Sequence, residues 1–342
     1  MALSRSNQFD DGTVLTESKL EGEFDNIYNN ALSLISPLTG NLAVGDFDLT
    51  GIGELAFTTE GDASAVGRLR RNGNNITWHD RTGAVPLQML VGGGIFGLTI
   101  TNDATDAAND ISVAIGAAVD STENRVIRFG TALIKQLDAA WAVGTNAGML
   151  DTGAIANTTY HIHLIHRSDT GVSDYLASTS ATAPTMPTSY DYRRRIGSIL
   201  RESATIIAFT QDGDYFRRSA SVLDVDSTNP GVAAVTRTLS VPTGVNVFAI
   251  LNMYLQPAGA TSGTQAHLSD IAAANEAPSL TAAPLAMSSA PVNVNEHGSR
   301  GPLFIRTDTS AQIRSRLAGT SDGSTIIRIA TSGWIDRRGR DA

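Results

Sequence analysis

Short runs of strand-forming residues, separated by Gly, Asn, Asp or Pro, occupy most of the chain from residue 92 to residue 342. Runs this short, rich in Val, Ile, Thr and aromatic residues, are typical of β-strands. Without long helical periods between them, they predict a mainly β protein with a Greek-key or jelly-roll-like sandwich over residues 92–342. The runs are FGLTI, DISVAIG, NRVIRF, TYHIHLIHR, SDYLAST, RIGSILR, TIIAFTQ, RTLSVP, NVFAILNMYLQ, PLFIRT and STIIRIAT.

Two segments of this region have a different pattern. The run ALIKQLDAAWAVG, residues 132–144, predicts a short helix at a corner of the sandwich. Residues 275–291, NEAPSLTAAPLAMSSAP, contain three prolines and predict a long surface loop.

Near the N-terminus, residues 13–36 predict a helix that begins at Thr16, a good N-cap, and stops before Pro37. Its apolar positions follow a heptad spacing of about two heptads, which is too short for a stable isolated coiled coil. Two interpretations stay open: an amphipathic helix packed on its own domain, or a helix at an oligomer axis. The seam residues are Leu20, Phe24, Ile27, Ala31 and Leu34.

Between these regions, residues 41–91 read as β-hairpins with few large apolar side chains. RLRRNGNNITWHD predicts one hairpin, with a tight turn at Asn72-Gly73. Such hairpins bury too little apolar surface to be stable alone, so we expect a shaft in which several chains share one core. The sequence thus predicts an arm and helix over 1–40, a shaft over 41–91 and the sandwich over 92–342.

Charge is distributed unevenly along the chain. The formal net charge is -9, and residues 1–66 contain eleven acidic residues against Arg5 and Lys19, so the remainder is neutral. An acidic arm on a neutral body argues against nucleic-acid binding and favours docking to a basic protein surface, or is simply solvated. There is no cysteine, and no signal peptide or membrane-length apolar run is recognisable, so we expect neither disulfides nor membrane insertion.

The stretch TYHIHLIHR contains half of the histidines of the chain. On a strand, Tyr160, Ile162 and Leu164 face one side, and His161 and His163 face the other. An H-x-H pair can chelate a divalent metal, and three pairs could meet at a trimer axis. No carboxylate or third ligand stands at a readable spacing, so we expect these histidines to face solvent or a neighbouring chain, and we expect no metal or other cofactor.

Three patterns resemble catalytic motifs. GTSDG would present Ser321 as a nucleophile, but the motif needs a strand before it and a helix after it, whereas the flanking runs here predict a hairpin. Asp212 with Asp214, and Asp224 with Asp226, could serve a glycosidase or bind calcium. The first pair reads more simply as a hairpin turn, and neither has further ligands, so we predict no enzymatic activity.

The densest basic and aromatic cluster is a candidate ligand site. Its arginines could bind an acidic glycan or the phosphates of lipopolysaccharide, or they could pair with acidic residues inside an oligomer. The cluster consists of Tyr190, Tyr192, Arg193, Arg194 and Arg195.

Several long segments resemble tail-fibre and related fibre proteins of tailed bacteriophages. LTESKLEGEFDNIYNNALSLISPLTGNL is similar to the start of such fibres, and ASAVGRLRRNGNNITWHDRTGAV to their short trimeric β-modules. The body resembles a C-terminal fibre domain through NDISVAIGAAVDST, KQLDAAWAVGTNAGMLDTGAIANTTYH, DTGVSDYLASTSATAPTMPTSYDYRRRIGSIL, FTQDGDYF and GWIDRRGR.

This resemblance implies a homotrimeric virion structural protein, made in the host cytoplasm and located on the tail or capsid surface. Its acidic N-terminal arm would bind other virion proteins, and its sandwich would bind a host cell-surface glycan or protein. A tail fibre is the first interpretation. A capsid fibre or decoration protein is the alternative, and a tailspike-like polysaccharide-degrading enzyme is disfavoured because the sequence has no solenoid repeat.

Overall fold

The structure is a computed structural model that divides into two compact units, Met1–Phe57 and Thr58–Ala342. In the first unit, the described residues between 17 and 24 have helical backbone, with Leu20 and Phe24 exposed. The remaining seam residues, Ile27, Ala31 and Leu34, lie outside the described residues. The described residues are 17–18, 20–22, 24, 68–72, 75–80, 83–86, 93–123, 125–257, 264–282, 287–289, 302–319 and 321–340.

The second unit begins with a three-stranded antiparallel sheet of β1 (Arg68–Asn72), β2 (Asn75–Asp80) and β3 (Gly83–Pro86). Asn72 lies opposite Asn75 in the register, so two residues connect the first two strands. This confirms the predicted hairpin, but the connection lies one residue later than the predicted turn at Asn72-Gly73, because Asn72 is the last residue of β1. The two connecting residues and most of the predicted shaft lie outside the described residues.

The strands that follow form a first sandwich, in which a sheet of eight strands faces a sheet of three. The larger sheet has the order β14-β13-β11-β12-β10-β9-β6-β5 and the smaller the order β4-β7-β8. Phe129 of β8 and Tyr175 of β12 join them, with ring centroids 4.6 Å apart. The strands are β4 (Ile95–Gly97), β5 (Ile100–Asn102), β6 (Asp110–Val113), β7 (Gly116–Val119), β8 (Val126–Phe129), β9 (Leu133–Ala140), β10 (Ala147–Leu150), β11 (Thr159–His166), β12 (Ser173–Ser178), β13 (Tyr192–Glu202) and β14 (Thr205–Ile206).

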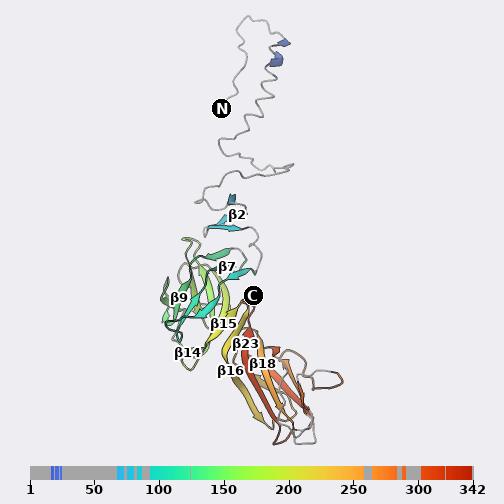
Figure 1. Cartoon of the computed structure of the whole chain (residues 1–342). Coiled ribbons are helices and arrows are strands. Elements are labelled where there is room, and N and C mark those ends of the chain that lie inside the picture. The colour runs from blue at the N-terminus through green and yellow to red at the C-terminus, as the bar shows by residue number, and fades with distance from the viewer. Residues whose placement is uncertain are drawn as a thin grey trace. The chain divides into compact units, whose positions relative to one another are not determined.

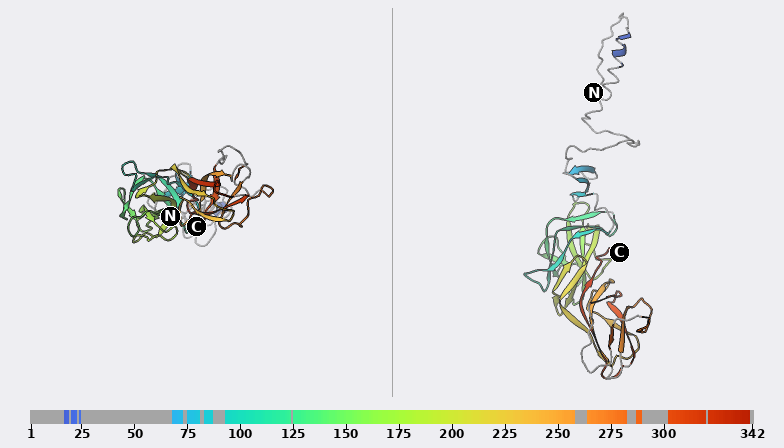
Figure 2. Two further views of the ribbon diagram at one scale, coloured as in Figure 1. Left: turned by 90° about the horizontal axis from the view of Figure 1, so that it is seen from below. Right: turned by 45° about the vertical axis from the view of Figure 1, so that its right-hand side comes forward.

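A second sandwich packs a five-stranded sheet, order β15-β16-β23-β18-β21, on a four-stranded sheet, order β17-β22-β19-β20. Alternate residues of β19 and β22 are buried, as expected of strands with one face on a core. Figures 1 and 2 show this sandwich in yellow to red. Its strands are β15 (Phe209–Asp212), β16 (Tyr215–Thr228), β17 (Val235–Thr238), β18 (Phe248–Gln256), β19 (Thr264–Asp270), β20 (Met287–Ser289), β21 (Leu303–Arg306), β22 (Gln312–Gly319) and β23 (Ile326–Ile335).

The two sandwiches share one apolar core. Phe216 of β16 lies opposite Trp334 of β23, and the two buried rings are stacked with centroids 5.5 Å apart. Gly197 of β13 makes room for the Phe216 ring, because a Cβ at this position would lie 3.0 Å from it. The long strands β16 and β23 therefore carry the core of the second sandwich into the first.

The mainly β prediction is confirmed, and the strands form two sandwiches where the sequence indicated one. The helix predicted for residues 132–144 is wrong, because Leu133–Ala140 is strand β9, paired with β6 and β10. Tertiary pairing overrides the helical propensity of its Ala, Leu, Lys and Gln residues. The predicted loop over 275–291 is irregular up to residue 282, but Met287–Ser289 adds strand β20 to the second sandwich. No helix among the described residues is long and apolar enough to cross a membrane.

Replacing Trp334 with Ala should destabilise the protein by about 3–5 kcal/mol, because it removes a fully buried aromatic side chain from the junction of the two cores. Denaturant unfolding of the full chain would measure the loss. The matched control is Phe304→Ala on β21, whose side chain is 52% exposed and whose removal should cost less than about 1 kcal/mol. Equal losses in the two variants would contradict a shared core.

Candidate functional site

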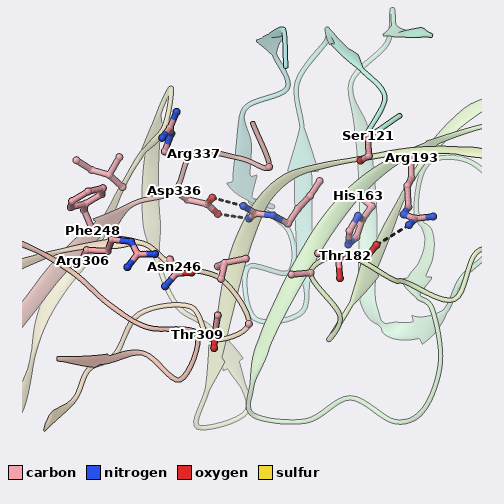
Figure 3. A pocket seen from close by; sticks show the side chains of 16 residues that line it. Ser121, His163, Thr182, Arg193, Asn246, Phe248, Arg306, Thr309, Asp336 and Arg337 are labelled. Atoms are coloured by element: carbon pink, nitrogen blue, oxygen red, sulfur yellow. Dashed lines mark hydrogen bonds and ion pairs between the residues drawn. The ribbon is translucent and has the colours of Figure 1, made fainter. Parts of the chain in front are cut away.

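A pocket of about 720 Å³ lies where the two sandwiches meet. One wall comes from the first sandwich and its loops, and the other from the second sandwich and the segment after β23 (Figure 3). The pocket therefore exists only when both sandwiches are folded and joined. It is lined by Ser121, His163, Ala181, Thr182, Arg193, Arg195, Gly244, Val245, Asn246, Phe248, Arg306, Thr309, Ile335, Asp336, Arg337 and Gly339.

A buried ion pair crosses the back of this pocket. Arg195 of β13 donates from both terminal nitrogens to the two carboxylate oxygens of Asp336, at 2.6 and 2.7 Å. The hydroxyl of Ser198 lies 3.1 Å from the same carboxylate and accepts from Arg195 at 2.9 Å. This bidentate geometry satisfies charges that would otherwise be costly to bury, and it ties the first sandwich to the end of β23.

The electrostatics of Asp336 are set by competing effects. Burial raises the pKa of this carboxyl, but the Arg195 guanidinium and the hydrogen bonds to the carboxylate outweigh burial and lower the pKa overall. Asp336 is therefore ionised in the folded protein at neutral pH.

The segment after Asp336 also binds the first sandwich to the second. Arg338 donates from Nε to the Ile196 carbonyl at 2.7 Å, and from its terminal nitrogen to the Leu98 carbonyl at 2.9 Å. Burial lowers the pKa of Arg338 to about 10, which leaves it charged at neutral pH. Arg340 forms an ion pair with Asp214 in the turn between β15 and β16. Asp336 and Arg338 enter the sequence analysis only as part of the GWIDRRGR segment, and neither residue is assigned a role there.

The prediction that His161 and His163 face solvent or another chain is wrong, because their exposed fractions are 0% and 1%. They do point away from Ile162 and its apolar neighbours, but the loop after β12 covers this side of the sheet. His163 lies 3.1 Å from the Ser180 carbonyl, and His161 lies 2.9 Å from the Ser198 hydroxyl. Periodicity placed these side chains on the correct face but could not reveal the loop.

Both imidazoles are held in the neutral form. Burial lowers the pKa of His161 to about 3, with a further contribution from the Arg195 charge. Burial likewise lowers the pKa of His163 to about 4. The nearby guanidinium also disfavours a bound cation here, and no group of three or more metal-ligating side chains occurs among the described residues.

The predicted basic and aromatic cluster is divided by the structure. Arg193 and Arg195 lie opposite Ile165 and His163, on the face that lines the pocket, whereas Arg194 lies on the other face and is buried. The pleat of β13 explains this separation, since successive side chains point to opposite faces. The guanidinium carbon of Arg125 lies over the Tyr192 ring, 5.1 Å from the ring centroid.

Tyr190 belongs to a second hollow, of about 560 Å³. It packs edge-on against Trp141, with centroids 5.2 Å apart, and Val143 and Val172 are exposed beside them. Trp141 is fixed by a hydrogen bond from its indole nitrogen to the Tyr175 carbonyl at 3.0 Å. This hollow is mainly apolar, in contrast to the arginine-rich pocket.

A buried lysine close to this hollow has a structural explanation. Lys135 forms an ion pair with Asp174 at 3.1 Å and donates to the carbonyls of Ala142 and Gly144. Burial lowers its pKa despite the opposing effect of Asp174. All three ammonium protons thus have acceptors, so Lys135 closes the turn after β9 and is not poised as a nucleophile.

The motifs that resembled catalytic sites have structural partners. Ser321 accepts from the Gly231 amide and lies 3.0 Å from the side-chain oxygen of Asn229. The predicted hairpin around it is wrong, because β22 and β23 belong to different sheets and the GTSDG turn connects them.

The two acid pairs are likewise structural. Asp212 lies opposite Tyr215, so Gly213-Asp214 is a two-residue turn, as predicted. Asp224 accepts from Ser240, and Asp226 pairs with Arg328.

Comparisons with known proteins leave the family open. No family model matches the chain, and no curated protein matches its sequence. A structure of the infectious bursal disease virus VP2 subviral particle is 9% identical, with 74% of each chain covered and a TM-score of 0.18. A structure of the Gt strain of that virus is 11% identical, with 69% of this chain and 67% of that chain covered and a TM-score of 0.17. TM-scores this low carry no argument about fold or function.

Replacing Asp336 with Asn should destabilise the protein by about 3–5 kcal/mol, because the Arg195 charge would stay buried without its counter-charge. Denaturant unfolding at pH 7 would measure the effect. The control Arg328→Gln breaks the exposed pair with Asp226 and should cost at most about 1 kcal/mol. A loss below that of the control would show that the buried pair does not hold the sandwiches together.

Stability should also decrease as the pH falls from 7 to 5. The pKa values of His161 and His163 are lowered in the folded state, so protons bind the unfolded chain first, below its pKa of about 6.5. The contribution of the two histidines to the free energy of unfolding is fully present above about pH 6.5. It is lost as the pH falls toward the folded-state pKa, about 4 for His163 and about 3 for His161. Each histidine should account for roughly 2 kcal/mol between pH 7 and pH 5.

The variant His163→Gln isolates this effect. It should lose less stability than the wild type between pH 7 and pH 5, as measured by urea unfolding midpoints at both values. The partly buried Gln265 of β19 supplies the control, since Gln265→Asn changes no titratable group and should keep the wild-type pH dependence. An unchanged slope in His163→Gln would contradict a buried neutral imidazole.

Proposed function

We propose that this protein is a virion fibre of a tailed bacteriophage, trimeric and anchored by its N-terminal arm, whose β-sandwich body binds a host cell surface. A tail fibre is the preferred location. The motif resemblance of the N-terminal segment, the hairpin module and the body supports this proposal.

The observation that carries the proposal is the separation of an acidic N-terminal unit from a mainly β body. Met1–Phe57 forms a unit of its own, and the net negative charge of the chain is concentrated in residues 1–66. An acidic segment favours docking to a basic protein surface. The exposed Leu20 and Phe24 are consistent with a helix whose apolar face is covered by other copies of the chain.

The same features would serve a capsid fibre or decoration protein, which we keep as the alternative location. A polysaccharide-degrading enzyme has less support. The acid pairs Asp212 with Asp214 and Asp224 with Asp226 lie in a hairpin and in strand β16, where three of these carboxylates have structural partners. In the arginine-rich pocket the lining carboxylate is Asp336, which is occupied by Arg195.

Deleting residues 1–40 should yield a folded body that no longer joins phage particles. The sandwiches lie within Thr58–Ala342, so their unfolding midpoint should stay close to that of the full chain. Incorporation would be measured by complementing a phage that lacks this protein and probing purified particles for the truncated chain. Normal incorporation would place the attachment elsewhere.

A full-length variant gives the matched control for assembly. Phe24→Asp places a charge in the proposed seam and should shift the sedimentation coefficient from a trimer toward a monomer at micromolar concentration. The exposed Leu280→Asp on the body should leave the trimer intact. A wild-type chain that sediments as a monomer would contradict the trimer.

A further inference from the structure

We propose that the pocket between the two sandwiches binds an anionic sugar, one that bears a carboxylate or a phosphate group. That this sugar belongs to a host cell surface rests on the proposed function. That the protein binds such a sugar is argued from the residues of the pocket alone. The volume of about 720 Å³ lies within the range of about 300–1,000 Å³ usual for small-molecule sites.

The charge of the lining residues favours an anion. Four arginines and a single aspartate line the pocket, and that aspartate is already committed to Arg195. Arg306 shares its charge with Asp270 at 2.7 Å. Arg193 uses one terminal nitrogen for the Thr182 carbonyl, and within the described chain no carboxylate pairs with it. The remaining donors of its guanidinium fork match the geometry of a carboxylate or phosphate.

The other lining residues suit a sugar ring. Phe248, which begins β18, is 40% exposed at the pocket, although an aromatic ring of this size is usually buried. Aromatic rings form flat apolar walls against which the C–H face of a sugar can pack. Figure 3 shows Asn246, Thr182 and Thr309 around the same opening, and their amide and hydroxyl groups can bond sugar hydroxyls.

The positions of these groups are fixed before any ligand binds. The Asn246 amide nitrogen donates to the Thr307 carbonyl at 2.8 Å, and Arg193 donates to the Thr182 carbonyl at 2.8 Å. The Arg195 and Asp336 pair holds the back of the pocket. A site whose polar groups are already ordered loses less conformational entropy on binding, which favours a specific ligand over diffuse attraction to any polyanion.

The test uses the full-length protein and three defined probes in isothermal titration calorimetry at low salt. The probes are a trigalacturonic acid, glucose 6-phosphate and a neutral galactose trisaccharide. We expect at least one acidic probe to bind and the neutral probe not to bind. The two acidic probes distinguish a carboxylate ligand from a phosphate ligand. Failure of both acidic probes, or equal binding of the neutral one, would overturn the proposal.

Two variants locate the binding. Arg193→Gln should weaken the acidic probe at least tenfold, and Phe248→Ala should weaken it as well while leaving the salt dependence of binding unchanged. The control Arg328→Gln removes an exposed arginine from the same sheet as Phe248. Arg328 lies opposite Tyr254 of β18. Tyr254 is six residues after Phe248, so Arg328 lies roughly 20 Å from the Phe248 side of the pocket. Wild-type affinity in Arg193→Gln, or an equal loss in Arg328→Gln, would contradict this pocket as the site.

The outcome is independent of the test of the fibre function. If the acidic probe binds but the chain is absent from particles, the pocket stands and the virion role fails. If the chain is on particles and excess protein blocks phage adsorption, while Arg193→Gln blocks equally well, the virion role stands and the pocket is not the receptor site.

Discussion

The buried ion pair between Arg195 and Asp336 is the interaction on which the arrangement of the body depends. It joins β13, which lies next to the edge strand β14 of the eight-stranded sheet, to the residue that directly follows β23 in the second sandwich. Two such charges are tolerable in a protein interior only when they meet with good geometry, and Ser198 and the Arg338 amide complete that geometry here. This directional pair adds to the apolar core that the two sandwiches share around Phe216 and Trp334.

The polar groups near this pair follow from the same constraint. The outer face of the eight-stranded sheet has polar residues where a solvent-facing strand would have them, yet loops and the second sandwich cover it. His161 and His163 are therefore neutral, and Lys135 needs Asp174 and two carbonyls to remain charged. The folded state is destabilised when buried residues of this face gain or lose protons. The same exclusion of water lowers the local dielectric constant around the arginines of the pocket, so that they attract an anion more strongly.

Much of the β architecture could be predicted from local sequence, and the site could not. Each of the strand-like runs overlaps a strand, although only the first two residues of RTLSVP do so, because β-branched residues and turn residues alternate clearly in most of them. The helix prediction for residues 132–144 is wrong because Leu, Lys, Gln and Ala favour a helix, whereas pairing with β6 and β10 makes Leu133–Ala140 strand β9. The pocket joins Arg193 to Phe248 and Asp336, residues far apart in sequence whose proximity no spacing rule reveals. Alternation along β13 did contain one usable signal, since it separates Arg193 and Arg195 from Arg194.

The contact between Arg338 and the Leu98 carbonyl has a consequence for biosynthesis. These two residues are separated by 240 positions, so the ribosome must release nearly the whole body before the first sandwich can be completed. Until then the core around Phe216 lacks Trp334, and apolar strand edges stay open to other nascent chains. Folding should therefore be slow and post-translational, as is usual when native contacts are remote in sequence.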